Sequence, residues 1–135
     1  MANGLYDSAR ESFLKGALSW SNDTIQVLLV DSTYAVNLST HTVLSDVSNT
    51  ARVGVSTPLI NKTATAGVAD ATDVTFPVVT NGKVVSAIIL YQSGVDDASS
   101  KLIAYIDAAA GLPFTGNGAS TTIQWDNGAN KIFKL

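Results

Sequence analysis

The residues of this chain that could do chemistry are few, and two pairs of aspartates lead them. Asp70 with Asp73, and Asp96 with Asp97, are spaced closely enough for general acid–base catalysis or for calcium binding. Both pairs lie in stretches rich in glycine, alanine and serine, where aspartate commonly accepts hydrogen bonds from the backbone of a turn. No alternating Asp-x-Asp-x-Asp pattern accompanies them. We therefore interpret them as turn residues, with catalysis and calcium binding as the alternatives.

Other catalytic or ligand-binding patterns do not emerge from the sequence. The chain has no cysteine and a single histidine, His41, which excludes disulfides, thiolate metal sites and histidine-rich zinc sites. No Ser/His/Asp set can be assembled around His41. The run Gly116-Asn117-Gly118 lacks the following Lys-Ser/Thr of a phosphate-binding loop and precedes a predicted strand. The sequence therefore predicts no enzyme, no cofactor and no metal.

Two tryptophans, Trp20 and Trp125, could stack on sugar rings. Such residues more often anchor a core or an interface, because the indole ring contributes a large apolar area and one polar handle. We predict the anchor role and keep carbohydrate binding as the alternative.

Length indicates a single domain, and the low charge indicates a surface that is either partly covered by partners or selected for durability outside a cell. Only 14% of the 135 residues are charged, against about a quarter in typical proteins, while 46% are apolar. The net charge of −3 comes without any Lys/Arg cluster, so no nucleic-acid partner is expected. No apolar run approaches the length of a membrane span, and the first four residues lack the pattern of a signal peptide. We expect synthesis in the cytoplasm and no membrane association.

The elements that must position these residues are mostly strands. Lys83–Tyr91 and Lys101–Asp107 are apolar on both of the faces that a strand presents, and so is Thr24–Asp31. Strands of this kind must be covered on both sides. The sequence therefore predicts that these three lie at the centre of the fold.

One α-helix is predicted near the N-terminus, over Leu5–Leu18. Leu5, Ala9, Phe13 and Ala17 recur at four-residue spacing, and Asn3 is a suitable N-cap. We expect this helix to cover one face of the sheet, with docking on a partner as the alternative.

Shorter strands complete the predicted fold. Asn81-Gly82 predicts a hairpin that returns the chain into the Lys83 strand, and Ser39 could cap a short helix over residues 40–47. Further strands are expected at Arg52–Ser56, Leu59–Ala66, Val74–Val78, Thr121–Trp125 and Lys131–Leu135, about eight in all. The prediction is a mainly β single domain (1–135), with antiparallel sheets in a β-sandwich or jelly-roll-like arrangement (about 24–135) and one N-terminal α-helix (about 4–19).

Three stretches resemble a known group of proteins. They are residues 1–16 (MANGLYDSARESFLKG), residues 61–76 (NKTATAGVADATDVTF), and the C-terminal segments KLIAYID, GLP and WDNGANKIF. Together they resemble small virion proteins of tailed bacteriophages, of the kind that decorate and cement the capsid. The resemblance implies a non-enzymatic, oligomeric β-sandwich, often a trimer, on the exterior of the virion. It implies partners in copies of itself and in the major capsid protein, and it transfers no catalytic motif.

Which surface would touch the capsid is predicted only from position in the chain. Termini and long loops usually lie outside a core, so the candidates come from the first six residues, the 111–120 loop and the C-terminal strand, with Trp20 added as an aromatic anchor. The candidate interface residues are Leu5, Tyr6, Trp20, Leu112, Pro113, Phe114, Phe133 and Leu135. The alternatives to a decoration protein are a tail, neck or fibre adaptor and a module that binds host-surface glycans.

Overall fold

A five-stranded antiparallel sheet forms the centre of the computed structural model, which describes residues 4–107, 112–123, 125 and 132–134. Its spatial order is β1-β9-β8-β2-β3. The strands are β1 (Gly4–Leu5), β9 (Lys101–Ile106), β8 (Ala87–Gln92), β2 (Ile25–Val30) and β3 (Arg52–Val55). Adjacent residues of β2 and β8, which point to opposite faces, are equally buried: Leu28, Leu29, Ile89 and Leu90 each have 0% exposure. The predicted central strands are thus confirmed.

Three smaller antiparallel sheets accompany the central one. The three-stranded sheet has the order β12-β5-β4, from β12 (Phe133–Lys134), β5 (Val68–Asp70) and β4 (Thr63–Thr65). The two-stranded sheets pair β6 (Val74–Phe76) with β11 (Thr121–Ile123), and β7 (Val84–Val85) with β10 (Phe114–Thr115). Short 3-10 turns lie at η1 (Leu44–Asp46), η2 (Asn49–Ala51) and η3 (Asp97–Ser99).

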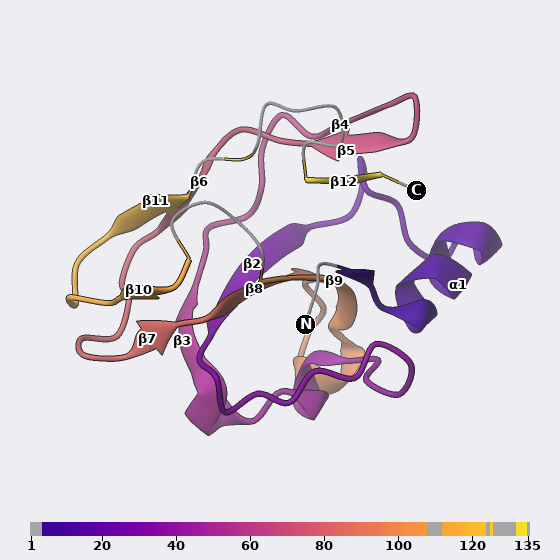
Figure 1. The fold of residues 1–135 in the computed structure, drawn as a ribbon. Helices are drawn as coiled ribbons and strands as arrows, with labels where there is room; N and C mark the ends of the chain where they lie inside the picture. The colour runs from indigo at the N-terminus through magenta and orange to yellow at the C-terminus, as the bar shows by residue number, and fades with distance from the viewer. Residues whose placement is uncertain (1–3, 108–111, 124, 126–131, 135) are drawn as a thin grey trace.

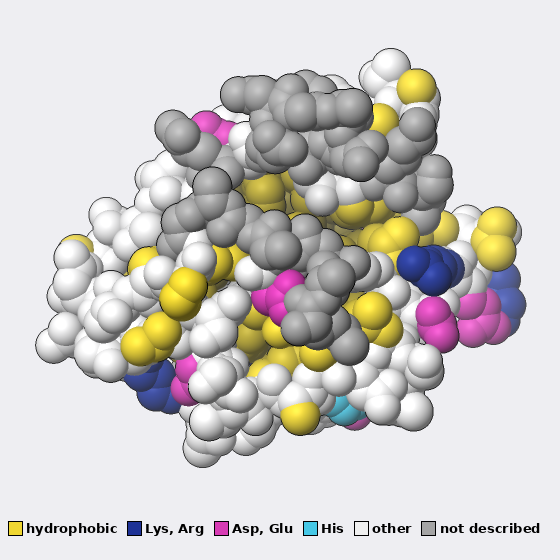
Figure 2. All heavy atoms as spheres, in the orientation of Figure 1, with side chains coloured by type: hydrophobic (Ala, Val, Ile, Leu, Met, Phe, Trp, Pro, Cys, Tyr) yellow, Lys and Arg dark blue, Asp and Glu magenta, His cyan; other side chains and the backbone are white. Residues whose placement is uncertain are grey.

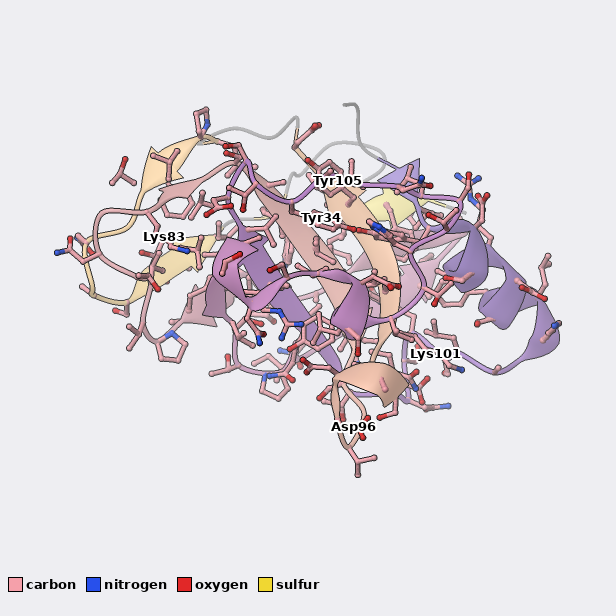
Figure 3. All side chains as sticks on the ribbon, turned by 90° about the horizontal axis from the view of Figure 1, so that it is seen from below. Tyr34, Lys83, Asp96, Lys101 and Tyr105 are labelled. Carbon is pink, nitrogen blue, oxygen red and sulfur yellow. The ribbon has the colours of Figure 1, made fainter. Side chains whose placement is uncertain are left out.

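The central sheet lies between two unlike layers. Figure 1 shows the small sheets on one side of it and the connection between β2 and β3, residues 31–51, on the other. Figure 3, seen from below, shows this connection crossing in front of the sheet. Residues of both layers, such as Phe76 and Val47, belong to the same buried core as the sheet. The predicted class, mainly β with antiparallel sheets and one N-terminal α-helix, is confirmed.

The helix is shorter than the sequence indicates. It spans α1 (Asp7–Lys15) and ends at Gly16, whose φ of 72° is the left-handed conformation that suits a helix C-cap. It begins late because Gly4 and Leu5 pair with Tyr105 and Ala104 as β1. The N-cap is Tyr6 and not Asn3, and its side chain makes no capping hydrogen bond. The helix packs beside β9 at the edge of the sheet (Figure 1).

The prediction that Asn81-Gly82 closes a hairpin between its flanking strands is wrong. The turn exists, with Gly82 at φ 79°, but β6 and β7 on either side of it pair with β11 and β10 instead of with each other. The reason is that the chain returns from residue 112 to lie against both. Gly116 donates its N–H to the Lys83 carbonyl and accepts the Gly82 N–H, at 2.8 and 2.9 Å.

A hairpin that the sequence does not predict lies a few residues earlier. Strands β4 and β5 are joined by Ala66 and Gly67, both with positive φ, as a two-residue hairpin loop requires. The expected strand over Leu59–Ala66 is reduced to β4, and the expected helix over residues 40–47 is reduced to the single turn η1. The strand expected from Lys83 to Tyr91 is interrupted at Ser86, between β7 and β8.

Candidate interaction surface

A groove with a single charged residue lies between two loops next to the small sheets. One wall is Thr57–Ile60, which follows β3, and the other is Thr72–Thr75, which leads into β6. The groove has a volume of about 410 Å³, and Asp73 is the single charged residue among those that line it. Leu59 and Val74 are buried at its floor, whereas Ile60 on its rim is 60% exposed. The groove therefore presents apolar and hydroxyl groups to whatever enters it.

Backbone hydrogen bonds fix the walls of this groove. The Thr57 N–H donates to the Thr75 carbonyl at 3.3 Å, and the Thr72 N–H donates to the Ile60 carbonyl at 3.0 Å, so the walls are joined at both ends. The Leu59 N–H donates to the Ile25 carbonyl at 2.8 Å, which ties one wall to the central sheet. Because these bonds set the spacing of the walls, the groove is preformed.

The apolar surface continues along the outer edge of β3. The Thr80 N–H donates to the Val53 carbonyl at 3.1 Å, and the Thr57–Thr75 bond lies at the other end of the same stretch. Residues 75–80 therefore run antiparallel to β3. Two exposed valines lie in this stretch, Val55 at 42% and Val78 at 61% exposure. We call the groove and this stretch together the β3–β6 face.

Charged side chains gather elsewhere. Helix α1 carries two exposed ion pairs, Arg10 with Asp7 at 3.7 Å and Lys15 with Glu11 at 2.5 Å. Figure 2 shows dark blue and magenta side chains around α1, while the side that carries β6, β7, β10 and β11 is largely white with some yellow, and has dark blue and magenta side chains only at its lower end. Leu14 is 89% exposed on the helix, a single apolar residue among these charges. The helix surface is thus charged, whereas the β3–β6 face exposes mainly apolar and hydroxyl side chains.

The eight interface residues predicted from the sequence fall into two sets. Leu5, Tyr6 and Trp20 are buried in the chain's own core, with at most 7% exposure, so a contact through them would require that core to open. Pro113 is exposed, and the side chains of Leu112, Phe114 and Phe133 are half-buried. Leu135 lies outside the described residues. The seven described residues do not form one exposed patch, because three of them are buried. The structure instead exposes Val55, Ile60 and Val78, which are not among the predicted residues.

Trp20 joins an aromatic cluster that connects the two ends of the chain. Its ring meets Phe133 edge-on at a centroid distance of 5.3 Å, and Phe13 of α1 lies 6.4 Å from Phe133. Both indoles donate to backbone carbonyls of the β5–β6 region, Trp20 to Asp70 at 3.3 Å and Trp125 to Thr72 at 3.2 Å. With 6% and 8% exposure, they are core anchors, and neither presents a ring on which a sugar could stack.

A buried chain of hydroxyls lies beneath the connection over residues 31–51. The Tyr6 and Tyr34 hydroxyls are 2.8 Å apart, and the Tyr34 hydroxyl is 2.8 Å from His41 Nδ1. The Tyr34 ring also lies 6.2 Å from that of Tyr105. Figure 3 labels both residues, seen from below. Burial, followed by the hydrogen bond with Tyr34, raises the pKa of Tyr6, and burial also raises the pKa of Tyr34. The only histidine is thus half-buried in a structural network.

The predicted turn role is confirmed for Asp96, whereas the partners of Asp97 and Asp73 lie far from them in sequence. Asp96 Oδ1 accepts the Ser99 N–H at 3.0 Å and caps η3, and Asp97 pairs with Arg52 at 3.0 Å. Asp73 Oδ1 accepts the Trp125 N–H at 3.1 Å. Within the described ranges, no group of three or more acidic or histidine side chains could hold a metal ion. No described helix has the length and apolar character needed to cross a membrane.

Comparisons with known proteins add no family to this description. No protein-family model matches the chain, and no curated protein matches it. The function is therefore argued from the molecule's own surface together with the resemblance of the three sequence stretches.

Proposed function

We propose that this chain is a structural protein of a bacteriophage virion, and specifically a decoration protein that binds the assembled capsid shell. The observation that carries the proposal is the β3–β6 face, a preformed surface of valine, isoleucine, proline and threonine with one carboxylate in its groove. Such a surface loses little hydration when it docks and gains from burial of its apolar groups. The resemblance of the three stretches to virion proteins supplies the class of partner.

Binding would stabilise the shell by linkage. A protein that binds the assembled lattice and not its separated subunits shifts the equilibrium toward the lattice by mass action. Many copies on one particle add their individually small contributions. The partners in this proposal are the major capsid protein and further copies of the chain, with a trimer as the proposed oligomer, and the location is the capsid exterior. The proposal includes no catalysis and no cofactor.

The test compares virions that contain the protein with virions made without it. We expect the deficient particles to assemble but to release their DNA at a lower temperature, and purified protein added back should restore heat resistance. Electron microscopy with a labelled antibody should place the protein on the head. Label on the tail, neck or fibres would replace the proposal with an adaptor role. Normal heat resistance with lost adsorption would replace it with host-surface binding.

Paired variants test whether the β3–β6 face makes the contact. Val78→Asp places a charge on the face, whereas Val95→Asp places the same charge on a valine that is 98% exposed in the β8–β9 turn and is not one of the residues that define the face. Both substitutions are at exposed positions and should leave the fold intact. We expect Val95→Asp to restore heat resistance on addition and Val78→Asp to fail. Equal restoration by both would show that this face is not the contact.

A further inference from the structure

The β4 strand is an uncharged edge that the rest of the described chain leaves open. In the sheet order β12-β5-β4, it pairs with β5 on one side only. All of its residues, Thr63, Ala64 and Thr65, are exposed, and so are Ala66 and Gly67 at the tip. Figure 1 shows the β4–β5 hairpin extending from the body of the molecule. Exposed edge strands of this kind pair readily with another strand.

The backbone groups of Ala64 point toward this open edge. In a two-residue hairpin, the residues that flank the loop, here Thr65 and Val68, form a hydrogen-bonded pair, so the next pair, Ala64 with Ala69, does not exchange hydrogen bonds. The Ala69 carbonyl accordingly accepts the Ile132 N–H at 3.1 Å, on the side away from β4. The N–H and C=O of Ala64 must therefore both face outward.

The strand is complementary to itself. If two copies of β4 run antiparallel with Ala64 opposite Ala64, Thr63 lies opposite Thr65 of the second copy, and Thr65 lies opposite its Thr63. Thr–Thr pairs across strands are favourable, and no like charges oppose each other in this register. The outward N–H and C=O of each Ala64 would meet those of the other, which completes a hydrogen-bonded pair.

The residue that would normally protect such an edge is directed elsewhere. Lysine next to an edge strand discourages pairing because its charge would be buried by the second strand. Lys62 precedes β4, but its Nζ donates to the Asp23 carbonyl, and burial lowers the pKa of Lys62. The edge is therefore left without a free charge.

From this geometry, we propose that β4 pairs antiparallel with β4 of a second copy of the chain, with Ala64 at the two-fold axis. The contact goes beyond the proposed capsid role and does not depend on it. A two-fold contact cannot close a ring of three, so in a trimer it would join one trimer to the next. One short strand from each copy forms a small interface, and the association is therefore weak and reversible.

Sedimentation equilibrium over a concentration series up to about 1 mM, where weak contacts become populated, tests the proposal. The wild-type mass should double as concentration rises, from monomer to dimer or from trimer to hexamer. Ala64→Lys and Ala64→Glu each place like charges opposite one another at the axis, and we expect either to raise the dissociation constant at least about tenfold. Ala64→Pro removes the outward N–H and should act in the same direction.

The decisive measurement is an equimolar mixture of Ala64→Lys with Ala64→Glu. Opposite charges then meet at the axis, so the mixture should associate again, and its recovery also shows that both variants are folded. The control, Ala98→Lys, makes the same change at an exposed alanine of η3 and should associate as the wild type does. A wild type whose mass does not double, an Ala64→Lys variant that associates normally, or a mixture that fails to recover would each overturn the proposal.

Discussion

The two layers that cover the central sheet differ in how far side chains take part in their hydrogen bonding. The small sheets depend on backbone pairing between segments far apart in sequence, such as β10 with β7 and β12 with β5. The connection over residues 31–51 also has a backbone bridge, between Val43 and Lys101 of β9, but side chains within it and from Arg52 of β3 satisfy several of its backbone groups. Asp46 accepts the N–H groups of Thr42 and Val43, and Arg52 donates to the carbonyls of Leu44 and Val47.

This difference decides where unpaired surface can remain. Side chains can fold a local connection back on itself and satisfy its polar groups from nearby residues. Short strands pair on one side and leave an edge on the other unless a further strand arrives. The open edge of β4 belongs to the layer of small sheets, and Val78 lies in the chain that connects two of their strands, while Val55 lies in β3, the edge strand of the central sheet beside it. We therefore expect partners to bind that layer and not the connection.

The largest expected effect contrasts the central sheet with the layer of small sheets. Ile89→Ala removes a side chain with 0% exposure from β8 and should lower the free energy of unfolding by about 2–5 kcal/mol. Ile60→Ala, the matched control on the groove rim at 60% exposure, should change it by about 0.5 kcal/mol or less. Urea unfolding followed by circular dichroism measures both values. Comparable losses in the two variants would mean that the rim is part of the core.

Sequence reasoning located the central sheet because its signal is local. The runs that contain β2, β8 and β9 are apolar on both faces. Their residues therefore predict both that they form strands and that these strands lie at the centre of the fold. The helix was placed too early because Leu5 and Tyr6 fit a helical stripe equally well. Pairing of Gly4 and Leu5 with β9 overrides that local preference.

The layer of small sheets could not be predicted in this way. Asn81-Gly82 is a strong hairpin signal, and the turn does form, but the choice of partner for each flanking strand depends on where residues 112–123 return. The candidate surface was missed for the same reason. Val55, Ile60 and Val78 have the composition of core residues, and only the finished packing shows that they are exposed. The low charge of the sequence around these three residues was the one signal that could have indicated a binding surface there.

A second prediction tests the backbone pairing between β7 and β10 in this layer. A Cβ on Gly116 would approach the Thr80 carbonyl oxygen more closely than van der Waals contact allows. Gly116→Ala must therefore move residue 116 and Thr80 apart, next to the pair formed by β7 and β10. We expect a loss of about 1–3 kcal/mol in stability from this overpacking. Hydrogen exchange should show the amides of β7 and β10 losing protection while those of β8 keep it. Uniform loss across the central sheet would contradict the separation of the layers.

A third prediction tests the hydroxyl chain under the connection. Tyr34→Phe leaves the buried Tyr6 hydroxyl without its Tyr34 partner and should cost about 1–3 kcal/mol. Tyr6→Phe is the matched control, because the Tyr34 hydroxyl keeps its bond to His41 and the loss should be smaller. Thermal unfolding of the two variants measures the difference. A larger loss for Tyr6→Phe would show that Tyr34 is not the centre of the chain of hydroxyls.

The smallest expected effect depends on pH and distinguishes side-chain capping from backbone pairing. The Thr42 N–H, with help from the Val43 N–H and the charge of His41, lowers the pKa of Asp46, although burial opposes the shift. A carboxylate whose pKa is lowered in the folded chain contributes stability that is full above its unfolded pKa of about 3.9 and is lost as the pH falls through its folded pKa. Asp46→Ala should therefore lower the free energy of unfolding by about 1 kcal/mol at pH 7, as the loss of a cap does. The difference in the free energy of unfolding between this variant and the wild type should disappear below about pH 4.

The control for this effect is Asp46→Asn, which keeps an oxygen acceptor for the same N–H groups but cannot titrate. At pH 7, Asp46→Asn should lower the free energy of unfolding by less than Asp46→Ala does. Its free energy of unfolding should also lack the decrease in acid that protonation of Asp46 causes in the wild type. Urea midpoints at pH 7, 5 and 3 measure both variants. If the gap between wild type and Asp46→Ala stayed constant from pH 7 to pH 3, the charge of Asp46 would not hold η1. The connection would then depend on packing and backbone bonds, as the opposite layer does.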